Sequence, residues 1–117
     1  MFALESNVYK KVTVLRLTGD VLIEDVQEFT NQLEAWLLAP RVREVALDLS
    51  RVGSMDHAGL GVLVSASTKS RSRGCRLVLL APAPHVKQLL QQVGIEEFFP
   101  MYESEDEMQG HLNMTTA

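Results

Sequence analysis

Runs of hydrophobic residues bounded by turn residues predict five strands. The run at residues 12–17 is rich in β-branched side chains and roughly alternates with polar positions, as in a strand. The runs at 45–50 and 76–81 are largely apolar, which is typical of strands covered on both faces. Residues 2–6 form a shorter run that we expect to pair with the first, and residues 98–102 contain a proline, which suits an edge strand.

Apolar residues spaced three and four apart predict helices between these strands. The spacing predicts helices over 26–37, 57–72 and 84–93, and in the last of these Val93 belongs to the apolar stripe. A serine at 104 followed by a glutamate at 107 forms a capping box, which predicts the start of a fourth helix.

The order of these elements, β-β-α-β-α-β-α-β-α, predicts an α/β fold. Strands that alternate with helices imply a mixed, mainly parallel sheet, here with about five strands and about four helices. The chain of 117 residues is long enough for one domain, which we place at 1–112, followed by a flexible tail at 113–117. We expect Gly19-Asp20 to break the second strand and residues 51–55 to form a loop.

Composition and charge exclude several classes of protein. The formal net charge of −4 gives no electrostatic attraction to phosphate backbones, so we expect no nucleic-acid partner. No stretch reaches the ~18 consecutive apolar residues of a membrane helix, and the start of the chain has no signal-peptide pattern, so we expect a cytoplasmic protein without membrane insertion. The single cysteine, Cys75, cannot form an internal disulfide, which fits a reducing compartment.

The segment from Asp56 to Gly61 opens the helix predicted over 57–72 and carries the candidate chemistry. Asp56 can accept hydrogen bonds from the free amides of the first turn, as an N-cap residue does. Gly59 and Gly61 each cost the helix about 1 kcal/mol relative to alanine. Such glycines are expected where a packed strand or the surface of a partner approaches the backbone, and the sequence leaves both explanations open.

At this segment the chain resembles the STAS domain family, of the anti-sigma factor antagonist type. The resemblance rests on residues 45–52, 55–63, 74–79, 89–95 and 98–99. It implies a single STAS-like domain with helices packed largely on one side of the sheet. It also implies a role, because members of the family bind a serine-kinase anti-sigma factor and thereby free the sigma factor. The kinase phosphorylates a Ser or Thr that directly follows the motif's Asp, and the phosphorylated antagonist is released.

The sequence departs from this family pattern at two positions. His57 follows Asp56 where the family has its Ser or Thr phosphoacceptor, and a serine kinase cannot modify an imidazole by hydroxyl chemistry. Leu22 stands where the family usually has an Asp after the Gly19-Asp20 turn. We therefore expect the recognition surface to be kept and the usual phosphorylation switch to be lost, with Ser54 as the candidate substitute phosphosite.

Three interpretations of His57 stay open. It is an exposed residue that touches a partner, a residue that receives a phosphoryl group on nitrogen, or a residue that responds to pH or to a metal. His85 and His111 are distant in sequence and show no ligand spacing with it, so a metal site is the least supported and we expect neither metal nor cofactor.

The resulting hypothesis is a protein-binding module that docks an anti-sigma factor or a related kinase-fold regulator. The residues expected to contact this partner are Asp20, Asp56, His57, Ala58, Gly59 and Gly61. The alternative is a STAS subunit of a lipid-transport ABC system or of a stress-signalling complex, and a homodimer stays open. We do not expect an enzyme, because no phosphate-binding loop and no Ser-His-Asp or Cys-His arrangement is present by motif.

Overall fold

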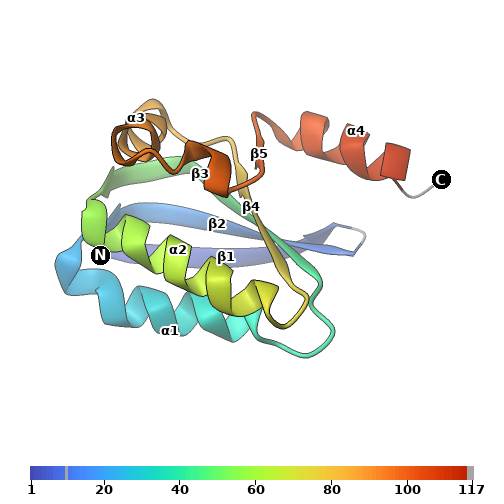
Figure 1. The fold of residues 1–117 in the computed structure, drawn as a ribbon, viewed down its shortest axis with the longest axis horizontal. Coiled ribbons are helices and arrows are strands. Elements are labelled where there is room, and N and C mark those ends of the chain that lie inside the picture. Colours follow the sequence, from blue (N-terminus) through green and yellow to red (C-terminus); the bar gives the residue numbers. More distant parts are fainter. Residues whose placement is uncertain (10, 116–117) are drawn as a thin grey trace.

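Five strands form one mixed sheet in the computed structural model of the chain (Figure 1), which describes residues 1–9 and 11–115, with side chains described as far as residue 110. Their order in the sheet is β1-β2-β3-β4-β5. Only β1 runs antiparallel to its neighbour β2, and the other neighbours are parallel, as the sequence predicts. The strands are β1 (Phe2–Tyr9), β2 (Val12–Val21), β3 (Glu44–Met55), β4 (Arg76–Leu80) and β5 (Met101–Tyr102).

The helices connect these strands in the predicted order. They are α1 (Val26–Leu37), α2 (His57–Arg71), α3 (Pro84–Val93) and α4 (Glu105–Thr115), with short 3-10 helices η1 (Ile23–Asp25) and η2 (Glu96–Phe98). Within the described residues no helix combines the length and the apolar character needed to cross a bilayer. Helix α4 reaches residue 115, residues 116–117 lie outside the described residues, and the flexible tail stays a prediction.

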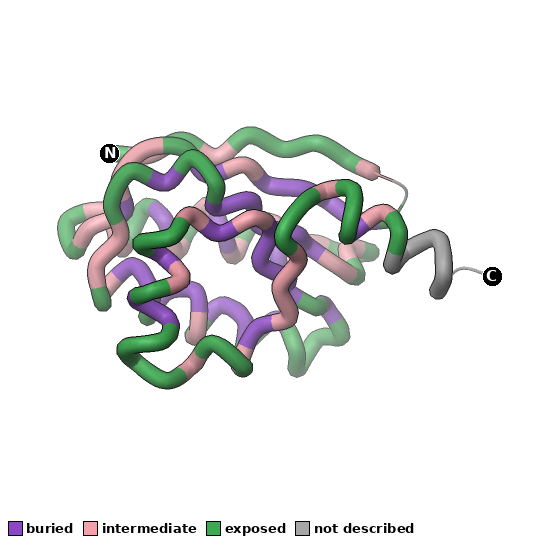
Figure 2. The backbone as a smooth tube through the Cα atoms, turned by 90° about the horizontal axis from the view of Figure 1, so that it is seen from above, coloured by how far each residue is buried: buried purple, intermediate pink, exposed green. Residues whose placement is uncertain are grey.

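The main core lies between one face of the sheet and the first three helices. Alternate residues of β2, β3 and β4 face this core, where they meet Phe29 and Leu33 of α1, Leu63 of α2 and Leu90 of α3. On the opposite face a smaller cluster joins Val14 and other strand residues to Met108 of α4. The buried residues accordingly form an inner layer beneath exposed helix surfaces (Figure 2). Three of the four helices therefore share one side of the sheet, as the family resemblance implied.

Two strands are longer than their hydrophobic runs predict. The expected break at Gly19-Asp20 is wrong, because β2 continues to Val21 with a register shift between these two residues and with Gly19 at φ +96. The expected loop at 51–55 is also wrong, because β3 pairs with this extension of β2 as far as Met55. The extension has few apolar residues, so its pairing was not visible in the hydrophobic pattern. It brings the end of β2 to the start of α2.

The predicted edge strand at 98–102 is shorter in the structure. Residues 96–98 form the 3-10 helix η2, and only Met101–Tyr102 pair with β4. Pro100 has no amide hydrogen to donate, although its carbonyl accepts a hydrogen bond from the amide of Leu79 in β4 at 2.9 Å.

Candidate functional site

Asp56 joins the start of α2 to the turn that follows β2. Its backbone is extended, and its Oδ1 atom accepts a hydrogen bond from the amide of Gly59 at 3.0 Å, so the predicted N-cap is confirmed. Its Oδ2 atom accepts a second bond, from the amide of Ile23 in η1, also at 3.0 Å. Both carboxylate oxygens are therefore used by backbone amides, and one side chain fixes two segments that are 33 residues apart. Asp56 is consequently a structural anchor rather than an acid or base toward His57.

The two glycines of the helix start differ in their surroundings. A methyl group added at Gly59 would lie 2.8 Å from the carbonyl oxygen of Val21 and 3.1 Å from Met55, so glycine is needed there for the packing of α2 on the end of β2. A methyl group at Gly61 would meet nothing within 4 Å, and Gly61 is exposed. The question left open by the sequence therefore has a separate answer at each position: Gly59 is required by the fold, and the fold alone does not require Gly61.

Asp20 and Ser54 face each other across β2 and β3. They are register partners near the ends of these strands, and both precede the Asp56 turn. The carboxylate of Asp20 lies over Gly53, where a methyl group would come within 2.5 Å of its Oδ1 atom. Ser54 is exposed and lies on a strand, not in a loop. Asp20 thus belongs to the same end of the molecule as Asp56, although no direct contact joins them.

His57 is the first residue of α2 and is exposed. It lies at one end of a shallow groove of about 390 Å³ between α2 and the end of α3. The other residues that line the groove are Leu60, Gly61, Val64, Ser65, Val93 and Ile95. Four of the seven lining residues, Leu60, Val64, Val93 and Ile95, have apolar side chains, and Gly61 has none. The start of α2 therefore adjoins a largely apolar surface.

Two exposed apolar residues near this surface were not predicted from the sequence. Val93 was assigned to the buried stripe of its helix, but its exposed fraction is 43%. Ile23 has an exposed fraction of 70%, although it lies three residues before Val26 and so at the spacing of the α1 stripe. The 3-10 turn of η1 breaks that spacing and turns Ile23 outward, while Asp56 holds its amide. Periodicity could not reveal this, because the turn depends on a contact with β3's end.

A second carboxylate, Asp25, fixes η1 from its other side. It accepts a hydrogen bond from the amide of Leu22 at 3.0 Å, and the amino group of Met1 lies 3.1 Å away. The amide of Leu22 is the main reason that the pKa of Asp25 is lowered, with a further contribution from the Met1 ammonium. The backbone amide of Leu22, the residue at the position where the family usually has an Asp, is therefore hydrogen-bonded to Asp25.

Other candidate groups do not join this site. Among the described residues, no three His, Cys, Asp or Glu side chains are placed to hold a metal ion. His85 lies on α3 and is exposed, and His111 lies outside the residues whose side chains are described. Ala58 follows His57 in the first turn of α2 and is half-buried.

Comparisons with known proteins agree with this arrangement. Residues 3–108 match the STAS domain family. BtrV of Bordetella bronchiseptica, described as a candidate anti-sigma factor antagonist, is 33% identical over 104 residues, which cover 82% of this chain and 89% of that protein. The anti-sigma F factor antagonist of Paenibacillus polymyxa is 22% identical over 102 residues, or 87% of each chain. A crystal structure of a candidate anti-sigma factor antagonist from Thermotoga maritima has a TM-score of 0.83 at 22% identity, with 94% of each chain covered.

The chain therefore belongs to the STAS domain family. It has the α/β STAS fold, and it is similar in sequence to anti-sigma factor antagonists. These antagonists are non-enzymatic regulators, in agreement with the prediction that the chain is not an enzyme.

Proposed function

We propose that this protein docks an anti-sigma factor, or a related serine-kinase-type regulator, through the start of α2. The residues that form the docking site would be the predicted set, Asp20, Asp56, His57, Ala58, Gly59 and Gly61, enlarged by the exposed Ile23. Asp56 would act by holding α2 and η1 together, because both of its oxygens accept amide hydrogens. Gly59 would act by letting α2 approach Val21. His57 and Ile23 would make the direct contacts.

The observation that carries this proposal is the rigid and exposed start of α2. An interface is bound more tightly when its surface is ordered before binding, because less conformational entropy is then lost. The double anchor of Asp56 supplies that order, and Ile23 offers an exposed apolar side chain of the kind that fills a pocket on a partner. The similarity to anti-sigma factor antagonists indicates the class of partner.

We further propose that the kinase activity of the partner does not end this binding. The residue at the phosphoacceptor position, His57, is exposed but has no hydroxyl group. The substitute acceptor Ser54 is exposed too, so it stays the alternative phosphosite that the test below must examine.

The test is a binding assay with each serine-kinase-type anti-sigma factor encoded in the same genome. Wild-type protein and the variants His57→Ser and His57→Ala are immobilised, and release of the kinase is followed with and without ATP. We expect wild type and His57→Ala to hold the partner under both conditions, and His57→Ser to release it only with ATP. His57→Ala is the matched control, because it removes the imidazole without adding a hydroxyl.

Intact mass measured at neutral pH accompanies the assay. Phosphorylation adds about 80 Da, the mass of a phosphoryl group. An ATP-dependent gain of this mass by wild type, mapped to residues 54–57 and accompanied by release, would contradict the loss of the switch. Failure of every such kinase to bind any of the three proteins would contradict the docking proposal itself.

Cytoplasmic location and the alternative role, as a subunit of a lipid-transport or stress-signalling complex, stay predictions. The neighbouring genes distinguish that alternative role from the proposed one.

A further inference from the structure

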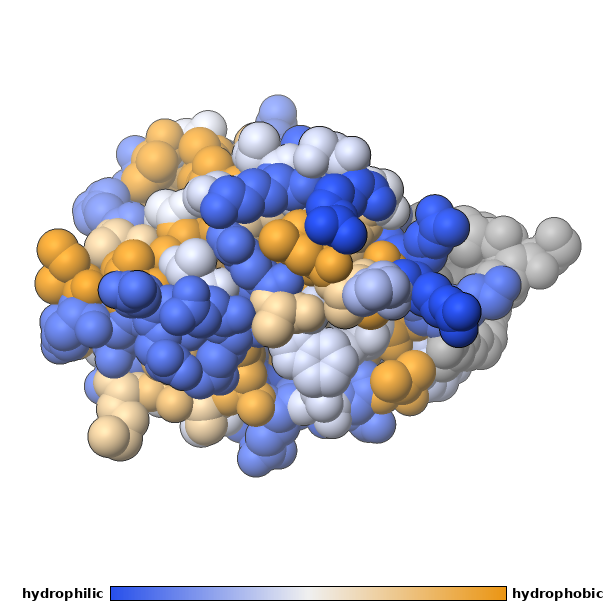
Figure 3. All heavy atoms as spheres, turned by 90° about the horizontal axis from the view of Figure 1, so that it is seen from below, coloured by the Kyte–Doolittle hydropathy of each residue, from blue (hydrophilic) through white to orange (hydrophobic). Residues whose placement is uncertain are grey.

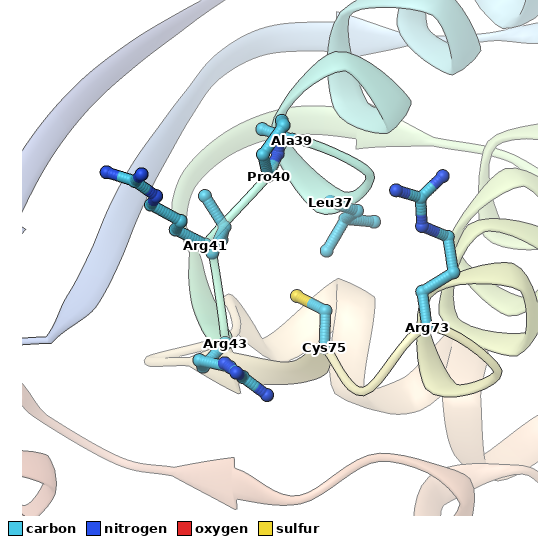
Figure 4. A pocket seen from close by; sticks show the side chains of 8 residues that line it. Leu37, Ala39, Pro40, Arg41, Arg43, Arg73 and Cys75 are labelled. Carbon is cyan, nitrogen blue, oxygen red and sulfur yellow. The ribbon is translucent and has the colours of Figure 1, made fainter.

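A pocket of about 230 Å³ lies at the far end of α2 from Asp56, beside the amino ends of β3 and β4. We call it the arginine pocket. The residues that line it are Leu37, Ala39, Pro40, Arg41, Val42, Arg43, Arg73 and Cys75. Figure 4 shows the sulfur of Cys75 pointing into the pocket, with the side chains of Arg43 and Arg73 on either side of it. The side chain of Arg41 extends away from the pocket at its rim.

The three arginines of the pocket have no partner in the described part of the chain, because no hydrogen bond, ion pair or ring contact involves their side chains. The neighbouring cations are all engaged. Lys69 lies 3.0 Å from Glu34, Arg76 lies 3.2 Å from Glu44, and Arg71 donates to the carbonyl of Phe98 at 2.6 Å. The three arginines without a partner therefore surround one pocket, beside cations that are already paired, although their guanidinium groups point away from one another in Figure 4.

The ends of the two nearby helices do not account for this charge. The carboxyl end of a helix carries roughly −0.5 of an elementary charge, so the ends of α1 and α2 together supply about −1 against three positive groups. Several of their last carbonyls already accept backbone amides, as Ser70 does from Arg73 and Cys75 and Glu34 does from Leu38. An excess of about two positive charges remains.

The pocket also has a backbone feature that the fold alone does not explain. Arg41 adopts a positive φ of 70°, which is strained for a residue with a side chain. The strained turn places Pro40 and Val42 on the pocket wall and Arg41 at the rim. Figure 3 shows that the most hydrophilic side chains on one face of the molecule, drawn in the darkest blue, lie in the middle and the right half of that view.

We propose that the arginine pocket binds a small ligand that carries a phosphate group, with the exposed side chains of Arg43 and Arg73 turning inward to contact the phosphate oxygens. A phosphate monoester carries about −1.5 to −2 charges at neutral pH, which matches the excess positive charge of the pocket. The planar guanidinium group suits this ligand because it can donate two parallel hydrogen bonds to a phosphate. Arg41 at the rim adds to the positive charge that attracts the anion.

The test is an NMR titration of the full chain with inorganic phosphate at constant ionic strength. We expect saturable shifts of the amides of Gly74 and Cys75 in the millimolar range. The double variant Arg43→Gln/Arg73→Gln should bind at least tenfold more weakly. The matched control is Arg51→Gln, which removes an exposed positive charge on β3, and it should bind as wild type does. All substituted residues are exposed, so the variants are expected to fold, which circular dichroism checks.

Phosphoserine and adenosine monophosphate serve as further probes, because the phosphate group could be free or carried by a larger molecule. Saturable binding of any of the three at Gly74 and Cys75, weakened in the double variant, supports the proposal, and their order of affinity identifies the source. Shifts that chloride reproduces, equal affinity of the double variant, or no binding of any probe would overturn it. A second measurement uses the single thiol: phosphate should slow the reaction of Cys75 with a thiol reagent in wild type but not in the double variant.

Discussion

The two ends of α2 use their polar groups in opposite ways. At the start, both carboxylate oxygens of Asp56 accept hydrogen bonds from backbone amides. The exposed surface beside them is formed by His57, Ile23 and an apolar groove. At the end, the arginine pocket keeps charged groups that nothing in the described chain neutralises. A polar side chain whose hydrogen bonds are made within the fold holds the surrounding surface in place, whereas a charged side chain without a partner is available to a ligand.

The largest expected difference between the two ends is in thiol reactivity. Burial raises the pKa of the Cys75 thiol, with a smaller contribution from the charge of Glu44, and only 3% of the residue is exposed. A thiol at position 57 would be exposed at a helix start, which lowers a thiol pKa. We expect His57→Cys, made together with Cys75→Ala, to react with a thiol reagent at neutral pH at least about a hundredfold faster than wild type.

The control for this measurement separates exposure from the effect of the helix start. Ser65 is exposed in the middle of α2, so Ser65→Cys with Cys75→Ala presents an exposed thiol away from either end. It should react faster than wild type but more slowly than the thiol at 57. Equal rates at 57 and 65 would contradict the view that the start of α2 favours an anion.

The next effect concerns the two glycines and tests which part of the start is fixed by packing. Gly59→Ala forces a methyl group against the carbonyl of Val21, and overpacking of this kind costs about 2 kcal/mol in the free energy of unfolding. Gly61→Ala meets nothing within 4 Å and should stabilise the helix by about 0.5–1 kcal/mol. Chemical denaturation of the two variants measures both values. A change of stability in the same direction for both substitutions would contradict the conclusion that only Gly59 is fixed by packing.

The smallest effect isolates the anchor itself. Asp56→Ala removes the cap of α2 and leaves the amide of Ile23 without its partner, which should cost about 1 kcal/mol in the free energy of unfolding. Asp56→Asn keeps an oxygen acceptor and should cost less, which makes it the matched control. Hydrogen exchange at Ile23 and Gly59 should speed up in Asp56→Ala. Unchanged exchange at both amides would show that the anchor does not hold the two segments together.

Local patterns were sufficient to predict the order of the elements and the capping of α2 by Asp56. The alternation and the three-to-four spacing identified the order of strands and helices because burial on one face imposes a period on the sequence. The capping role of Asp56 was predictable because an N-cap residue contacts an amide only three positions along the chain. The family motif around Asp56 likewise predicted a candidate site there, together with its unusual His57, from neighbouring residues alone.

Long-range packing decided the remaining features. The contact of Asp56 with Ile23, the separate roles of Gly59 and Gly61, and the exposure of Val93 all depend on where β2 and α3 end, not on residue spacing. The arginine pocket joins a turn after α1 to a turn after α2, about 30 residues apart in the chain, so no local pattern predicts it. Local sequence patterns predicted the order of the helices and strands, because burial on one face imposes a period on nearby residues, but they missed the extensions of β2 and β3 and the 3-10 helix η2. Only the tertiary structure decided which polar groups are paired, because pairing requires segments that are distant in sequence to meet.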